Sequence, residues 1–170
     1  AWAAFNVDVL NNSWGGGTPS TILSLTIASA LSNNRVVVFA SGNDNRNSLD
    51  YPASLSSGNN GLLAVGASNL CDFRKTPNND NCNNFEYKWG SNFGEGLDVV
   101  APGVAIYTTD MTDMEAKTCG NWGGKYYPYF NGTSAATPHV AGLAALMKSL
   151  NRNLTNGEIE AIIKQRADKI

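Results

Sequence analysis

The sequence is poor in charge, in histidine and in long apolar stretches. Charged residues make up 15% of the 170 positions, the formal net charge is −2, and no block of one sign occurs. A nucleic-acid-binding protein would normally carry a basic face, so this pattern argues against that class. No apolar run approaches the roughly 18 residues of a membrane-spanning helix. The apolar fraction of 42% is ordinary for a globular protein and favours one folded domain, or part of one.

Cysteine is also scarce, with only Cys71, Cys82 and Cys119. An odd number leaves one thiol free or one partner outside the chain. Cys71 and Cys82 flank a polar stretch that a disulfide could close. Cys119 also lies in a predicted loop and could take either partner, and three reduced thiols are the remaining alternative.

Hydrophobic patterning predicts a single α/β domain over residues 1–170. The continuous apolar run Val36–Ala40 is typical of a strand buried on both faces of a parallel sheet. Residues 134–150 are small or apolar on most sides, which predicts a buried central helix. Thr155-Asn156-Gly157-Glu158 is a capping-box pattern that opens the last helix. The predicted strands are 7–10, 36–40, 62–65 and 97–100, and the predicted helices are 18–31, 134–150 and 155–163.

The strongest chemical signal is the segment Phe130–Gly142, which places Ser134 after a glycine turn at the start of the predicted buried helix. Free N–H groups and the positive end of the helix dipole would favour a developing oxyanion there. The alternative is a serine that caps an ordinary helix, and spacing alone favours that alternative.

The run Gly132-Thr133-Ser134 through Gly142 resembles the nucleophile motif of the subtilisin-like serine proteases, the subtilases. The resemblance implies a three-layer α/β fold with a mainly parallel sheet between helices. It also implies a serine endopeptidase that hydrolyses peptide bonds in proteins. Further segments resemble the family in the family's order, namely Asp8–Gly16, Val36–Asn43, Tyr51–Ala53, Ala64–Ala67, Ser91–Gly94 and Leu97–Gly103.

Carried over position by position, Ser134 is the acylating nucleophile. Asn43 donates its side-chain amide to the oxyanion beside the backbone N–H of Ser134. A turn asparagine between a strand and a loop is the alternative for Asn43. The segment Asp8–Gly16 resembles the strand and loop that bind the substrate backbone in the family. The family's primary specificity pocket lies between two segments, which in this chain are Ser13-Trp14-Gly15 and Ala40-Ser41-Gly42.

Two acidic residues, Asp44 and Asp50, resemble the rim and the floor of the family's primary specificity pocket. Two carboxylates there would favour a lysine or arginine side chain of the substrate by charge pairing. The alternative is that both are solvated loop acids and that Asp50 pairs with Arg46.

His139, the only histidine, cannot be the base for Ser134. Five residues along a helix turn the side chain by about 140° net and advance it by about 7.5 Å, so it points away from the serine. We expect a packed histidine with hydrogen-bonded nitrogens. The family's catalytic aspartate and histidine lie in Asp-(Ser/Thr)-Gly and His-Gly segments, and neither occurs in this sequence. The resemblance therefore predicts a domain truncated at both ends, with the aspartate and histidine supplied from upstream sequence.

The resemblance also implies a structural calcium ion. Related subtilases hold Ca²⁺ with an aspartate that matches Asp98 and with two loop carbonyls, here from about Asn60 and Leu62. Oxygen ligands of this kind suit calcium. The alternative is that Asp98 caps a backbone turn.

Family analogy and the possible disulfides imply a secreted, extracellular protein whose signal peptide is missing from this chain. The expected partner is a protein or peptide substrate, not nucleic acid or a membrane, and the expected state is a monomer completed by the N-terminal part of the same domain. A catalytically inactive homologue retained for binding is the rival function, against which the presence of both Ser134 and Asn43 argues. Another type of serine hydrolase is disfavoured because no Gly-x-Ser-x-Gly segment occurs.

Overall fold

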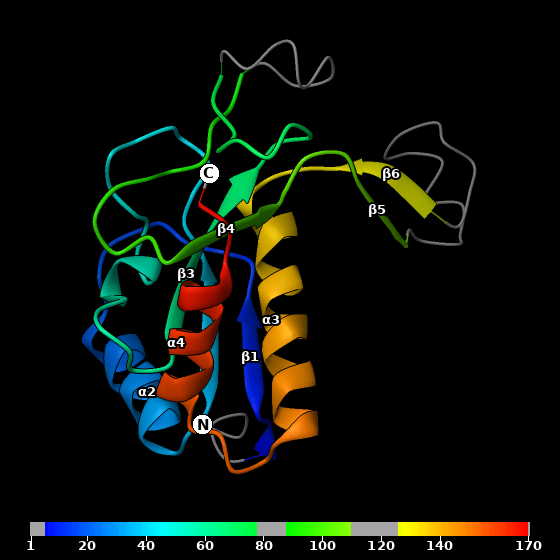
Figure 1. The fold of residues 1–170 in the computed structure, drawn as a ribbon. Coiled ribbons are helices and arrows are strands. Elements are labelled where there is room, and N and C mark those ends of the chain that lie inside the picture. The colour runs from blue at the N-terminus through cyan, green and yellow to red at the C-terminus, as the bar shows by residue number, and fades with distance from the viewer. Residues whose placement is uncertain (1–5, 78–87, 110–125, 170) are drawn as a thin grey trace, which may run out of the picture.

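The computed structural model describes residues 6–77, 88–109 and 126–169. A four-stranded parallel sheet in the order β1-β2-β3-β4 forms its centre (Figure 1). The strands are β1 (Val9–Asn12), β2 (Val36–Ala40), β3 (Leu62–Ser68) and β4 (Val99–Pro102). β2 has the predicted bounds, whereas β1 and β4 each begin two residues later than the patterning indicates. Asp98 therefore lies just before β4.

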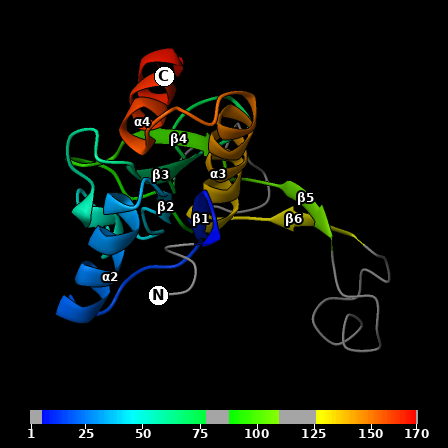
Figure 2. The same cartoon turned by 90° about the horizontal axis from the view of Figure 1, so that it is seen from below.

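Helices cover both faces of this sheet, which confirms the predicted three-layer α/β fold. The helix α2 (Thr21–Ser32) and the short 3₁₀ helix η1 (Ala53–Leu55) pack on one face, and α3 (Thr133–Leu150) and α4 (Asn156–Arg166) pack on the other (Figure 2). β2 shows why both faces need cover. Its Val36 and Val38 lie in the core beneath α3 and α4, while Val37 and Phe39 lie in the core beneath α2.

Local sequence signals account for the helix starts. Ser20 caps α2 through its side chain, so this helix begins after Pro19 and not at it. The predicted capping box of α4 is confirmed, because the Thr155 hydroxyl accepts from the Glu158 N–H and the Glu158 carboxylate accepts from the Thr155 N–H. Such a cap contributes about 1 kcal/mol.

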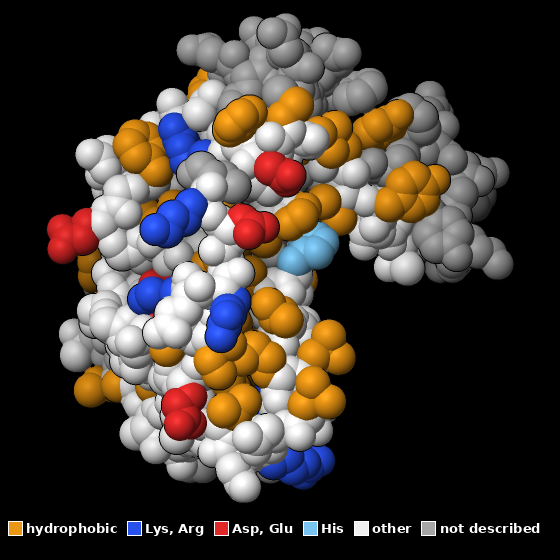
Figure 3. Space-filling view, viewed as in Figure 1, with side chains coloured by type: hydrophobic (Ala, Val, Ile, Leu, Met, Phe, Trp, Pro, Cys, Tyr) orange, Lys and Arg blue, Asp and Glu red, His pale blue; other side chains and the backbone are white. Residues whose placement is uncertain are grey.

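The prediction of a helix buried on most sides was wrong for α3. One side packs on all four strands, but Leu143, Leu146 and Leu150 are 48%, 65% and 89% exposed. Figure 3 shows hydrophobic side chains gathered on this face, near the only histidine. Small residues let α3 approach the sheet closely. They do not show whether another element covers the outer side of the helix.

A two-stranded antiparallel hairpin of β5 (Ile106–Thr109) and β6 (Tyr126–Phe130) was not predicted. It extends away from the sheet (Figure 1). The stretch from about 110 to 129, which contains Gly, Trp and Tyr, favours a long loop in the sequence, and β6 begins within that range. In the part of the chain that the structure describes, no helix is long and apolar enough to cross a membrane.

Candidate active site

Ser134 lies in the first turn of α3, directly after the turn made by Gly132. Gly132 caps the helix with a φ of 120°, a conformation that suits glycine because it has no Cβ. The Ser134 hydroxyl donates to the Ser13 carbonyl oxygen at 3.0 Å. Among the described residues, the Ser134 backbone N–H has no hydrogen-bond acceptor, as is usual for a donor at a helix N-terminus. The serine therefore combines a surface-accessible hydroxyl with a free N–H.

The side chain of Asn43 is held against the same turn. Its Oδ1 accepts from the Thr133 N–H at 2.9 Å and from the Thr133 hydroxyl at 3.1 Å. A Cβ atom built on Gly132 would lie 3.6 Å from both Asn43 Nδ2 and the Ser134 backbone nitrogen. Asn43 Oδ1, which is already bonded to Thr133, lies 3.5 Å from the same point. The space beside Gly132 is therefore bordered by two N–H donors and by an acceptor that is already in use.

Two backbone segments, 13–15 and 40–42, meet at the carboxyl end of β2. A Cβ atom on Gly15 would lie 3.6 Å from the Ala40 carbonyl oxygen and 3.2 Å from the Cβ of Asp50. The Trp14 ring packs edge-on against Phe39 with ring centroids 5.3 Å apart. The structure thus brings together the two segments that the resemblance places on either side of the primary specificity pocket, with Asp50 next to both.

Asp44 and Asp50 share one arginine. Arg46 Nη2 donates to Asp44 Oδ2 at 2.6 Å and to Asp50 Oδ1 at 2.7 Å. The Arg46–Asp50 pairing that the sequence left open is therefore present. We refer to Asp44, Arg46 and Asp50 as the Arg46 cluster.

Sequence reasoning missed Asn92 as the residue that shapes this loop. Asn92 is fully buried, and its Oδ1 accepts from the backbone N–H groups of Asp44 and Arg46 at 3.0 and 3.1 Å. Its Nδ2 donates to the Ser41 carbonyl at 3.2 Å and to Asp50 Oδ1 at 3.3 Å. The residue lies in a segment that resembles the family core, but nothing in that pattern indicates which loop it would hold.

Comparison with known proteins agrees with this geometry. The sequence model of the Subtilase family matches residues 1–170. This chain belongs to the subtilase family.

Curated subtilases are similar over nearly the whole chain. Subtilisin BL of Lederbergia lenta is 38% identical over 170 residues, which are 99% of this chain and 52% of that protein. Subtilisin NAT of Bacillus subtilis subsp. natto is 37% identical over 171 residues, which are 98% of this chain and 37% of that protein. The chain thus spans about half or less of the length of these relatives.

Solved subtilase structures share the fold. A cold adapted subtilisin-like serine proteinase superposes with a TM-score of 0.71 at 30% identity, over 99% of this chain and 52% of that one. A protease from Pseudoalteromonas arctica PAMC 21717 gives a TM-score of 0.71 at 31% identity, over 96% of this chain and 45% of that one.

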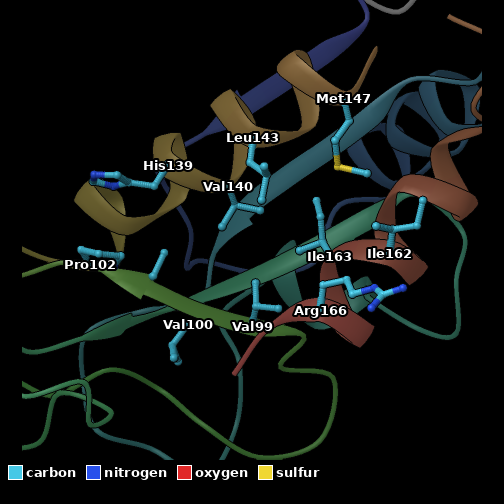
Figure 4. Close-up of a pocket in the computed structure, with 12 residues that line it drawn as sticks. Val99, Val100, Pro102, His139, Val140, Leu143, Met147, Ile162, Ile163 and Arg166 are labelled. Carbon is cyan, nitrogen blue, oxygen red and sulfur yellow. The ribbon is translucent and has the colours of Figure 1, made fainter. Parts of the chain in front are cut away.

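His139 makes no hydrogen bond to Ser134 among the described residues. Its Nδ1 lies 2.9 Å from the Ala135 carbonyl oxygen, one helical turn back, whereas the Ser134 hydroxyl bonds to Ser13. The expectation of a packed histidine was wrong, because its side chain is exposed. It lies at one end of an apolar groove of about 440 Å³ between β4, α3 and α4 (Figure 4). Val140, Leu143 and Met147 line the same groove from α3 (Figure 4).

A second arrangement of one cation and two carboxylates lies between α4 and the sheet. Lys164 Nζ bonds to Asp98 Oδ1 at 2.8 Å, to the Gly58 carbonyl at 2.9 Å and to Glu160 Oε1 at 3.2 Å. The side chains of Asp98 and Glu160 are 5% and 0% exposed. We refer to Asp98, Glu160 and Lys164 as the Lys164 cluster.

Burial governs the acid–base properties of the Lys164 cluster. Removal from water raises the pKa of the Glu160 carboxyl, and bonds from the Gly61 N–H and Lys164 offset this only in part. Burial opposes the charged form of Lys164, but the carboxylates of Asp98 and Glu160 outweigh it and raise the pKa of its ammonium. The ammonium of Lys164 therefore holds its proton more tightly than a lysine in water does.

The predicted calcium ligands do not suit a metal ion as they stand. Asp98 Oδ1 binds the Lys164 ammonium, and its Oδ2 accepts from the Ser56 hydroxyl at 2.6 Å and from the Ala64 N–H at 2.8 Å. The Leu62 carbonyl, one of the two predicted loop carbonyls, accepts from the Ser56 hydroxyl at 3.2 Å. No group of three or more metal-binding His, Cys, Asp or Glu side chains occurs among the described residues. Calcium at Asp98 stays a prediction, one that the nearby ammonium disfavours by charge repulsion.

Cys71 forms a disulfide bond. This finding removes the alternative of three reduced thiols. Cys82 and Cys119 lie outside the described residues, so the choice between them stays as open as the sequence left it.

Proposed function

We propose that this chain supplies the nucleophile and the oxyanion hole of a serine endopeptidase that hydrolyses peptide bonds in proteins. One observation carries the proposal: the Asn43 side chain is anchored to Thr133, beside the free N–H of Ser134. Because Oδ1 is used for the anchor, Nδ2 is left to donate to a substrate oxygen. Membership in the subtilase family supports the same chemistry.

In the proposed reaction, the Ser134 hydroxyl oxygen attacks the carbonyl carbon of the scissile bond and gives its proton to a base. The carbonyl oxygen becomes an oxyanion that accepts hydrogen bonds from Asn43 Nδ2 and the Ser134 N–H. Collapse of this intermediate breaks the C–N bond, and the leaving amine takes up a proton. Water then hydrolyses the ester on Ser134 and returns the proton to the serine. His139 is turned to Ala135, so we assign the base and its aspartate to residues outside this sequence.

The proposed substrate is a peptide or protein chain that runs between segments 13–15 and 40–42. Glycines at Gly15 and Gly42 allow the Asp50 side chain to lie against both segments, since a Cβ atom on either would come within 3.2 Å of it. We further propose that the protein acts outside the cell, as a monomer completed by the N-terminal part of its domain. The disulfide of Cys71 supports the extracellular setting, since such bonds persist in oxidising compartments.

The test uses the protein that carries these residues, treated with a fluorophosphonate probe and with a peptide substrate. We expect the wild-type serine at position 134 to be labelled and Ser134→Ala to be unlabelled and inactive. Asn43→Ala should lower kcat by about 10²–10³-fold with a small change in KM, because the donor acts mainly in the transition state.

Ser149→Ala is the matched control, because Ser149 lies in the same helix and its exposed hydroxyl bonds only to the Leu146 carbonyl among the described residues. It should be labelled and active like the wild type. Peptide binding by an unlabelled and inactive wild-type protein would favour the rival function, a binding module.

A further inference from the structure

Asp50 lies next to both segments that the proposed function assigns to the substrate. A Cβ atom on Gly15 would be 3.2 Å from the Cβ of Asp50, and one on Gly42 would lie 2.5 Å from its carboxylate oxygen. The Asp50 side chain is only 17% exposed. A substrate side chain that enters between the two segments would therefore meet this carboxylate.

Arg46 already neutralises the Asp50 carboxylate. Its Nη2 donates to Asp50 Oδ1 at 2.7 Å, and the other side-chain donor to that oxygen is the neutral amide of Asn92 at 3.3 Å. The same Nη2 reaches Asp44 Oδ2 at 2.6 Å. The guanidinium thus takes the position beside Asp50 that the cationic end of a lysine or arginine substrate would need.

The main-chain N–H of Arg46 is also held, which fixes the point from which its side chain extends. The buried Oδ1 of Asn92 accepts from the N–H groups of both Arg46 and Asp44. An arginine held on a fixed stem competes for Asp50 as an intramolecular partner, with a high effective concentration. A substrate cation would have to displace it and would meet a charge of its own sign.

We infer that Arg46 is a specificity-determining residue, which directs the cleft away from lysine and arginine before the scissile bond and towards uncharged side chains. The inference rests on the proposed function, because it concerns the substrate of the same cleft. Without Arg46, Asp44 and Asp50 would present two uncompensated carboxylates and favour basic side chains. Specificity is thus set by a repulsive group and not only by attraction.

The experiment measures kcat/KM for matched peptides that differ only in Leu, Phe or Lys before the scissile bond. The wild-type protein should cleave the Leu and Phe peptides about tenfold faster than the Lys peptide. Arg46→Gln should raise kcat/KM for the Lys peptide by about tenfold and change the other two by less than about threefold. The gain should shrink at high salt, because this cleft is partly exposed.

Two variants keep the test specific. Arg46→Lys retains the charge and should keep the wild-type order of peptides. Arg35→Gln removes an arginine that pairs with Asp8 at the opposite end of β2, and it should alter none of the three rates. The same Lys-to-Leu ratio in wild type and Arg46→Gln, with Ser134-dependent cleavage intact, would overturn the inference alone. Absence of Ser134-dependent cleavage would instead remove the proposed function and this inference with it.

Discussion

The Arg46 cluster and the Lys164 cluster have the same composition, one cation shared by two carboxylates, but they differ in exposure. In the Arg46 cluster the side chains of Arg46, Asp44 and Asp50 are 56%, 62% and 17% exposed. In the Lys164 cluster those of Lys164, Asp98 and Glu160 are 31%, 5% and 0% exposed. Exposed ion pairs contribute little to stability because water competes with them. Buried carboxylates need their partner, since removing it leaves a charge without solvent.

The difference in exposure goes with a difference in the expected role of the two ion-pair clusters. The Lys164 cluster joins α4 to the sheet and to the loop before β3, where no substrate is expected. The Arg46 cluster lies at the junction of the two proposed substrate segments, where its charge can meet a ligand. We therefore expect mutations in the Lys164 cluster to change stability and mutations in the Arg46 cluster to change specificity.

The largest effect should come from Lys164→Met, which strands two buried carboxylates. We expect the free energy of unfolding to fall by about 3 kcal/mol, measured by urea denaturation. The loss should be smaller when Glu160→Gln is already present, since only Asp98 then stays charged. A loss below about 0.5 kcal/mol in the wild-type background would show that the cluster is no more stabilising than an exposed pair.

A smaller effect is expected from pH. The raised pKa of Glu160 means that the folded state binds this proton more tightly than the unfolded chain, so stability falls as the pH rises from the ordinary pKa of glutamate through the folded value. Lys164 likewise contributes fully below the ordinary pKa of lysine, and this contribution is lost as the pH rises through its higher folded value.

Both predictions are tested by measuring the denaturation midpoint over the acidic range for Glu160 and over the alkaline range for Lys164. Glu160→Gln should flatten the fall in the acidic window, and Lys164→Met should flatten the fall in the alkaline window. Profiles parallel to the wild type in both variants would contradict the assignment.

Arg46→Ala should have a still smaller effect on stability. Because Arg46 and Asp44 are exposed, and the less exposed Asp50 keeps its bond from Asn92, we expect a loss of about 1 kcal/mol or less in the free energy of unfolding. Its effect on peptide preference should be much larger by comparison. A loss close to that of Lys164→Met would erase the distinction between the two clusters.

Chelation of calcium should have the smallest effect. Because the Lys164 ammonium already supplies the positive charge at Asp98, EDTA should leave Tm unchanged. A fall in Tm on chelation, reversed by added calcium, would restore the predicted calcium ion and require Lys164 to move aside.

The sequence predicted those parts of the molecule whose physics is local or strongly patterned. Val36–Ala40 was placed correctly because five consecutive apolar residues are buried on both faces. The capping box at Thr155 depends only on residues three positions apart and was also correct. β6 was missed because it pairs across a long connection and carries no such pattern.

Charge pairing was the part of the candidate site that sequence could not decide. Arg46 could be suspected as a partner of Asp50, but the bond requires the loop conformation that Asn92 imposes from 46 residues away. Lys164 was not considered as a partner of Asp98, from which it is even more remote in the chain. Such pairs have no periodicity, so only the folded backbone specifies them.

The bond between Ser134 and Ser13 has a consequence for synthesis, because it joins residues 121 positions apart. The anchor between Asn43 and Thr133 spans 90 positions, and the parallel strands also pair across intervening segments of the chain. Chains dominated by distant contacts fold slowly. The reactive centre is thus assembled only when almost all of this chain has left the ribosome. A protein proposed to cut peptide bonds is thereby inert during the interval when its own unfolded chain is easiest to cut.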